Sequence, residues 1–180
     1  MKREREASER GRAVFFDRDG VVNKVILRDG KPFSPRTLEE FVLTEGVRET
    51  VSILKRKGYK AILISNQPEV ARGRITRDTL DQMMQRVNGE VALDDIFICL
   101  HDDDDHCVCR KPKPGMILEA SRKWKIDLRA SYVIGDTWKD MEAGKAAGCK
   151  TILLDAVYNR DVRSDFRVTS LAEAVDIILE

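Results

Sequence analysis

The stretch FFDRDGVVN, residues 15–23, runs from two apolar side chains directly into two aspartates that are one residue apart. The apolar pair indicates the end of a buried strand, and the aspartates and glycine after it indicate a turn. Because side chains alternate along an extended segment, Asp17 and Asp19 fall on the same side of it. Two like charges at the end of a buried strand cost free energy, so we expect a chemical role that requires them there.

Short apolar runs alternate with amphipathic segments along the rest of the chain. Strands are predicted at residues 13–16, 60–65, 95–99, 131–136 and 150–155, and helices at residues 46–58, from 76, at 114–124, at 137–147 and from 170. This alternation predicts an α/β fold, a Rossmann-like parallel sheet with helices on both faces. The segment 24–44, which contains RDGKPFSP, has no helical period and is expected to form a short hairpin or flap over the sheet edge.

The helices are predicted from the spacing of their apolar residues and from their ends. Leu80, Met83, Met84 and Val87 repeat at helical spacing behind a capping Thr76. Gly58 suits a helix C-terminus, Pro114 a first helical turn, and Ser170 with Glu173 a capping box.

Composition limits the class of protein. The 180 residues are 42% hydrophobic and 35% charged, with a net charge of +1, which predicts a globular domain and gives no reason to expect nucleic acid or a membrane surface as partner. The first twelve residues are charged and contain no apolar segment of a signal peptide, so we expect a tail at 1–12, one domain at 13–180 and a cytoplasmic location. No apolar helix remains unpartnered in the prediction, which favours a monomer.

Polar residues gather at the carboxyl ends of the predicted strands. They are Asp17 and Asp19 after the first strand, Ser65, Asn66 and Gln67 after the second, and Gly135 and Asp136 after the fourth. In an open α/β sheet, ligands bind beyond these ends, so the sequence predicts one site there.

Four carboxylates at that site, Asp17, Asp19, Asp136 and Asp140, would repel one another. Hard oxygen ligands suit Mg²⁺, which would keep Asp17 ionised for attack on phosphorus. A carboxylate nucleophile forms an acyl phosphate and divides a difficult hydrolysis into two steps. The alternative, that the aspartates are only turn and N-cap residues, does not explain why they all fall at one edge.

Phosphate oxygens need donors and positive charge beside the nucleophile. Ser65 offers a hydroxyl, Asn66 a backbone amide and Lys111 an ammonium group.

Four motifs, DRDGVVN, ISNQ, CRKPKPGM and GDTWKDMEAG, resemble those of the haloacid dehalogenase superfamily. More narrowly, the chain is similar to the small phosphatases of subfamily IIIA that act on heptose bisphosphate or histidinol phosphate. The resemblance covers most of the chain and implies a Mg²⁺-dependent phosphatase without a large cap domain.

The resemblance also implies roles for individual residues. Asp17 would be the nucleophile and Asp19 the general acid and base, while Ser65 and Lys111 would hold the transferring phosphoryl group. Asp136 would bind Mg²⁺ with Asp17 and the Asp19 carbonyl, Asp140 would be a further ligand or an outer group, and Arg110 and Asn66 would help to bind substrate.

A second cluster, CLHDDDDHCVC at residues 99–109, contains three cysteines and a histidine within eleven residues. Cys99, His101, Cys107 and Cys109 suit tetrahedral Zn²⁺, and with four protein ligands the site would be structural. His106 is the rival imidazole ligand, and a reduced loop without metal is the remaining alternative.

Residues near these motifs have simpler interpretations. Asp102 to Asp105 are expected to form a solvated loop tip, Trp124 and Trp138 to pack, Met83 and Met84 to lie in the core, and Cys149 to be a small core residue.

The substrate is less clearly indicated. ARGRIT (71–76) and KPKPGM (111–116) resemble the heptose-bisphosphate phosphatases, which would place the protein in heptose precursor synthesis for surface polysaccharide. The five residues between His101 and Cys107 make a short loop that resembles the histidinol-phosphate type, and Pro68 and Glu69 depart from the NQSG of both groups. We favour D-glycero-D-manno-heptose 1,7-bisphosphate, with histidinol phosphate or another small phosphate ester as alternatives.

Two other classes are disfavoured. A receiver-type signalling domain needs adjacent acidic residues after its first strand and a phosphate acceptor after its third, and neither is present. A catalytically silent zinc-stabilised binding module would not need a complete catalytic set.

Overall fold

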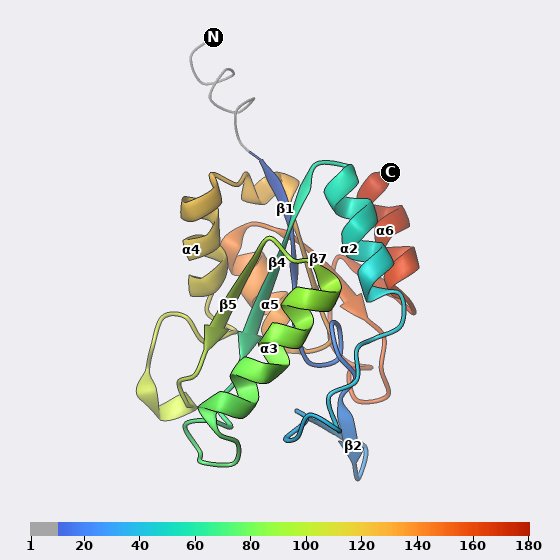
Figure 1. Ribbon diagram of the computed structural model, residues 1–180. Helices are drawn as coiled ribbons and strands as arrows, with labels where there is room; N and C mark the ends of the chain where they lie inside the picture. Colours follow the sequence, from blue (N-terminus) through green and yellow to red (C-terminus); the bar gives the residue numbers. More distant parts are fainter. Residues whose placement is uncertain (1–10) are drawn as a thin grey trace.

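The computed structural model describes residues 11–180, and its centre is a six-stranded parallel sheet in the order β5-β4-β1-β6-β7-β8 (Figure 1). The strands are β1 (Arg12–Phe16), β4 (Tyr59–Asn66), β5 (Asp95–Cys99), β6 (Tyr132–Gly135), β7 (Lys150–Leu154) and β8 (Phe166–Val168). The predicted α/β class and all five predicted strands are confirmed.

The edge strand β8 was not predicted. It has only three residues, two of them exposed, so it carries no apolar run that a sequence pattern could reveal. Tertiary pairing creates it: Phe166, Arg167 and Val168 align with Ile152, Leu153 and Leu154 of β7.

Helices cover both faces of the sheet. Three of them, α2 (Val47–Arg56), α3 (Arg77–Val91) and α6 (Leu171–Leu179), contribute to one buried cluster, and α4 (Gly115–Trp124) and α5 (Trp138–Ala147) contribute to the other. Alternate residues of β1 separate in the same way, because Val14 and Phe16 belong to the first cluster whereas Ala13 and Phe15 belong to the second. Short 3₁₀ turns lie at Asp103–Asp105 and Leu128–Ala130.

Most of the predicted helix ends are confirmed. Thr76 caps α3, and Gly58 follows α2 in the left-handed conformation. The box at α6 is incomplete, because Ser170 accepts from the Glu173 amide but the Glu173 carboxylate accepts from the amide of Thr169 instead of Ser170.

The segment 24–44 contains the expected hairpin, with β2 (Ile26–Arg28) antiparallel to β3 (Lys31–Phe33). Asp29 and Gly30 form its turn with positive φ angles of 50° and 71°. In Figure 1 this hairpin extends from the same end of the sheet as the loops that follow β1 and β4.

The predicted tail, residues 1–12, lies outside the described residues except for Gly11 and Arg12. Arg12 is not part of a tail, because it begins β1 and its guanidinium lies 4.2 Å from the centre of the Tyr59 ring. Within residues 11–180, the helices are all too short or too polar to span a membrane.

The chain order places a site beside β1. From β1 the chain builds β4 and β5 on one side of it, then crosses to β6, β7 and β8 on the other. Parallel sheets bind ligands at such a reversal, which here lies between the carboxyl ends of β1 and β6, at Asp17 and Asp136.

The two-sided core predicts a clear contrast within α4. Ile117 is 1% exposed in the second cluster, whereas its neighbour Leu118 is 36% exposed. Ile117→Ala should lower the free energy of unfolding by about 2–5 kcal/mol, and Leu118→Ala should change it by about 0.5 kcal/mol or less. Urea unfolding measures both, and equal losses would show that α4 packs differently.

Candidate active site

A buried ion pair forms the floor of the site. Lys111 Nζ donates to Asp17 Oδ1 at 2.7 Å, to Asp140 Oδ1 at 2.6 Å and to the Ile64 carbonyl at 3.1 Å. The lysine side chain is 4% exposed, so the ammonium group has exchanged water for these three acceptors. Residues from β1, α5 and β4 are therefore joined at one cation, as sequence analysis expected for Asp17 and Lys111.

Asp140 has two tasks in this arrangement. Its other oxygen, Oδ2, accepts from the Thr137 amide at 3.0 Å and from the Thr137 hydroxyl at 2.6 Å, which caps α5. Both of its oxygens are thus engaged, which favours the outer position over direct metal ligation.

Asp136 completes a group of three buried carboxylates. Carboxylate oxygens of Asp17, Asp136 and Asp140 all lie within 4.8 Å of one another. Asp136 Oδ2 accepts from the Tyr158 hydroxyl at 2.5 Å, while Oδ1 is buried without a hydrogen-bond partner. A buried oxygen in this state costs free energy unless a cation or donor reaches it.

The pKa values reflect this crowding. Burial raises the pKa of Asp17 to about 7, with a further contribution from Asp140 that Lys111 only partly offsets. Burial also raises the pKa of Asp136, and the Asp17 charge adds to it. Burial alone would lower the pKa of Lys111, but Asp140 and Asp17 outweigh it and raise that pKa.

These residues fit a hard divalent cation. They offer oxygen ligands, and one carboxylate oxygen has no hydrogen-bond partner among the described residues. Bound Mg²⁺ would contact that oxygen and offset the burial and repulsion that raise the pKa values of Asp17 and Asp136.

Asp19 is held on the side of the site that faces the hairpin of β2 and β3. It accepts hydrogen bonds from Arg18, from Asn23 at 3.0 Å, from Ser34 at 2.8 Å and from Gln67 at 2.8 Å. Burial would raise its pKa, but the Arg18 guanidinium and the amide donors outweigh burial and lower it.

The polar residues at the carboxyl end of β4 form a second layer. Ser65 is 1% exposed, and its Oγ accepts from Gln67 Nε2 at 2.9 Å, so its own proton is free for another acceptor. The Asn66 side chain donates to the Lys111 carbonyl at 2.9 Å and accepts from the Lys111 amide at 3.0 Å. Asn66 therefore holds the backbone of Lys111 with its side chain. It also lines the cleft, and its role in substrate binding stays a prediction.

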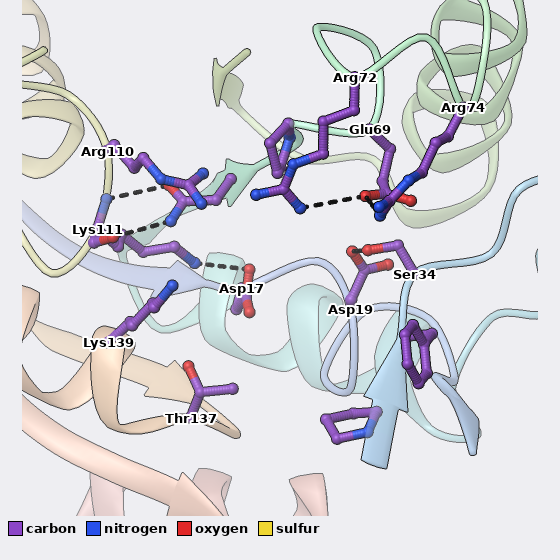
Figure 2. A pocket seen from close by; sticks show the side chains of 14 residues that line it. Asp17, Asp19, Ser34, Glu69, Arg72, Arg74, Arg110, Lys111, Thr137 and Lys139 are labelled. Atoms are coloured by element: carbon purple, nitrogen blue, oxygen red, sulfur yellow. Dashed lines mark hydrogen bonds and ion pairs between the residues drawn. The ribbon is translucent and has the colours of Figure 1, made fainter. Parts of the chain in front are cut away.

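Above this floor is an open cleft of about 340 Å³ (Figure 2). Its lining includes Asp17 and Asp19, Phe33 of β3 and the adjacent Ser34, and basic side chains from two loops and from α5. Those basic residues are Arg72, Arg74, Arg110, Lys111 and Lys139. A cleft with a carboxylate floor and a cationic mouth suits an anionic ligand with more than one charged group.

Ion pairs fix the arginines at the mouth. Arg72 donates to both oxygens of Asp102 at 2.6 and 2.5 Å and to Glu69 at 3.4 Å, and Figure 2 shows it reaching into the cleft. Arg110 donates to Asp103 at 2.8 Å and to the His101 carbonyl at 3.2 Å.

Three of the four residues of the acidic run are exposed, as sequence analysis expected, but Asp102 and Asp103 also make ion pairs. Asp102 and Asp103 connect the cysteine-containing loop to cleft arginines, because those cations come within reach only in the folded chain.

The cysteine cluster assembles as predicted. The Sγ atoms of Cys99, Cys107 and Cys109 lie 3.2–3.6 Å apart, and His101 Nδ1 lies 3.5 Å from Cys99 and 3.3 Å from Cys109. His101, not the rival His106, belongs to the cluster. Burial and the Cys109 thiol raise the pKa of Cys99 to about 12, so a cation is needed to ionise all three thiols. The donors and their number fit Zn²⁺.

Other predictions about single residues are mostly confirmed. Met83, Met84 and Cys149 are buried, and Trp124 packs against the second cluster while donating to Asp95. The prediction for Trp138 is wrong, because this first residue of α5 is 52% exposed.

A family model described as haloacid dehalogenase-like hydrolase matches residues 23–148. The chain belongs to this family. A D-glycero-beta-D-manno-heptose-1,7-bisphosphate 7-phosphatase of Helicobacter pylori is 37% identical over 149 residues, which cover 79% of this chain and 83% of the relative. A D-glycero-alpha-D-manno-heptose-1,7-bisphosphate 7-phosphatase of Burkholderia mallei is 34% identical over 179 residues, 92% of this chain and 88% of the relative.

Solved structures agree with this family. The D,D-heptose 1,7-bisphosphate phosphatase from B. bronchiseptica, solved with magnesium and phosphate, superposes with a TM-score of 0.82 at 28% identity. The match covers 93% of this chain and 98% of that structure. The predicted fold and superfamily are thereby confirmed.

Sequence analysis does not predict the roles of three residues of the site. Arg18 is fully buried beneath Asp19, Gln67 links Asp19 to Ser65, and Tyr158 contacts Asp136. The position of Gln67 beside Ser65 and Asn66 was a usable signal. For Tyr158, distant in sequence from every motif, there was none.

The raised pKa of Asp17 predicts how stability depends on pH without metal. In the unfolded chain this carboxyl has a pKa near 3.8, and in the folded protein about 7, so the folded state binds the proton more tightly. In a metal chelator, the free energy of unfolding should fall as pH rises from about 4 to about 7, by at most about 4 kcal/mol from this group. Denaturant unfolding at several pH values measures it.

The control is Asp17→Asn, which cannot titrate and should show a smaller fall over the same pH range. An identical pH dependence in the wild type and in this variant would contradict the prediction.

Proposed function

We propose that the protein is a Mg²⁺-dependent phosphatase that removes the 7-phosphate of D-glycero-D-manno-heptose 1,7-bisphosphate through an aspartyl-phosphate intermediate. The observation that carries the proposal is the buried Lys111 ammonium group between Asp17 and Asp140, at the floor of a cationic cleft. The similarity to curated heptose bisphosphate phosphatases supports it.

Asp17 is the proposed nucleophile. Its N–H donates to the Ile134 carbonyl at 2.9 Å, which joins the end of β1 to β6 and fixes the carboxylate. An Asp17 oxygen attacks phosphorus, the bond from phosphorus to the sugar oxygen breaks, and Lys111 neutralises charge on the phosphoryl oxygens. The Ser65 hydroxyl, whose proton is free, donates to the same group.

Asp19 is the proposed acid and base. Because its pKa is lowered in the free protein, Asp19 must take up a proton as the anionic substrate binds. It gives this proton to the leaving sugar oxygen in the first step and takes one back from the attacking water in the second, when the bond from Asp17 to phosphorus breaks. Its contacts with Arg18, Gln67 and Ser34 hold the carboxylate at one place beside the nucleophile.

Asp17, Asp136 and the Asp19 carbonyl would hold the Mg²⁺, with Asp140 as an outer group. When bound, this ion supplies Lewis-acid stabilisation of phosphoryl charge and offsets the repulsion among the carboxylates.

The mouth of the cleft supports a doubly charged substrate. Arg72, Arg110 and Lys139 lie around the opening above Asp17, where they would bind the phosphate that is not transferred (Figure 2). Arg110 keeps its proposed role in substrate binding. The reaction would supply a heptose monophosphate for surface polysaccharide synthesis. The cytoplasmic location and the monomeric state of the protein stay predictions from the sequence.

The substrate is tested by phosphate release with Mg²⁺ from the heptose bisphosphate and from histidinol phosphate, side by side. Because histidinol phosphate has no second phosphate for the arginines, kcat/KM should favour the bisphosphate by at least about tenfold, the equivalent of one charged contact.

Asp17→Asn is the control and should lower kcat on the order of 10³-fold or more. Preference for histidinol phosphate would show that the short cysteine loop is the better guide. Activity on other esters alone would overturn the substrate but not the chemistry.

We also propose that Cys99, His101, Cys107 and Cys109 bind one structural Zn²⁺. Cys109→Ser should lose the metal and lower the melting temperature, because zinc binding stabilises the folded loop. Its KM should rise, since Asp102 and Asp103 of that loop hold Arg72 and Arg110.

Cys149→Ser is the matched control, because Cys149 is a buried cysteine that does not belong to the group of possible metal ligands. Metal analysis by atomic emission measures zinc in both proteins, and a full zinc content in Cys109→Ser would contradict the site.

A further inference from the structure

We propose that Tyr158 is a positioning residue for the metal ligand Asp136, and that the loop between β7 and β8 is the outer support of the metal site. This inference rests on the proposed function only in that Asp136 binds Mg²⁺. It concerns residues outside the four motifs and outside the cleft lining.

One loop holds Asp136 at two points. The Tyr158 hydroxyl donates to Asp136 Oδ2 at 2.5 Å, and Asn159 Nδ2 donates to the Asp136 backbone carbonyl at 2.8 Å. Asn159 Nδ2 also donates to the Leu154 carbonyl at 2.9 Å, so the same amide group joins the ends of β6 and β7. Side chain and backbone of the ligand are both fixed from this loop.

The loop itself is organised from β8. Arg167 donates to the Asn159 carbonyl at 3.2 Å and to the Val162 carbonyl at 2.7 Å. Asn159 Oδ1 accepts from the Ala156 amide at 3.0 Å, and Asn159 is 2% exposed. Tyr158 therefore lies in a segment with fixed backbone, and its hydroxyl is placed before any metal binds.

The contact decides which oxygen of Asp136 remains for the metal. Oδ2 is engaged by Tyr158, whereas Oδ1 is buried without a hydrogen-bond partner among residues 11–180. A carboxylate oxygen of Asp136 lies within 4.8 Å of one of Asp17. A carboxylate with one oxygen engaged offers the other as a single, oriented ligand. Outer hydrogen bonds of this kind fix ligand orientation, and their loss typically costs 10- to 100-fold in metal affinity.

Tyr158→Phe removes only the hydroxyl and is the variant of choice. The matched control is Tyr132→Phe at the opposite end of β6, where the hydroxyl accepts only a long hydrogen bond, at 3.4 Å, from Lys150. Mg²⁺ binding is measured by calorimetry on the full chain without substrate, and Mn²⁺ binding by electron paramagnetic resonance.

We expect the Mg²⁺ dissociation constant of Tyr158→Phe to rise about 10- to 100-fold, and that of Tyr132→Phe to stay within about twofold of the wild type. At saturating Mg²⁺, the KM for substrate should match the wild type, because Tyr158 does not line the cleft. A merely structural tyrosine would lower the melting temperature in chelator without moving the metal constant.

The wild type provides a second measurement if the variant does not fold. Mg²⁺ bound beside Asp136 should perturb the tyrosine ultraviolet absorbance, and a wild-type difference spectrum without that change would overturn the inference.

The outcomes separate this inference from the function. Unchanged Mg²⁺ affinity in Tyr158→Phe, with binding in the wild type, overturns the role of Tyr158 and leaves the phosphatase proposal standing. No Mg²⁺ binding in the wild type overturns the metal site itself and this inference with it.

Discussion

The structure of the site depends on one buried cation. Lys111 contacts a residue at the end of β1, the carbonyl of Ile64 in β4 and a residue in the first turn of α5, so three elements far apart in sequence meet at its ammonium group. An ammonium group with 4% exposure is stable only where acceptors replace its water. The three acceptors do so, and two of them are the carboxylates of Asp17 and Asp140.

The lysine does not neutralise the whole site. Lys111 contacts two of the three clustered carboxyl groups, and Asp136 Oδ1 has no hydrogen-bond partner within residues 11–180. This excess negative charge makes the floor a place for a divalent cation, and the basic mouth makes the cleft above it a place for an anion.

The cysteine loop and the cleft are parts of one arrangement. Cys99 is the last residue of β5. In the loop after it, Asp102 pairs with Arg72 and Asp103 pairs with Arg110, and Lys111 follows directly. The conformation of this loop therefore sets the positions of Arg72 and Arg110 at the mouth of the cleft and of Lys111 at its floor. A metal in the cysteine cluster would act on substrate binding without touching the substrate.

The amino-acid sequence alone predicts a parallel sheet with helices on both faces. It also predicts the strand ends beside which Asp17 and Asp136 lie, and the two groups of residues that could bind metal ions. Those features are local, because the periodicity of a helix or strand, its capping residues and the spacing of a motif each involve residues that are close in sequence. Only the tertiary structure decided that Asn66 holds the Lys111 backbone, that Asp102 is paired with Arg72, that three residues form β8, and that Tyr158 reaches Asp136. Each of these depends on the packing of segments that are distant in sequence, and a hydrogen bond between such segments leaves no period or spacing in the chain.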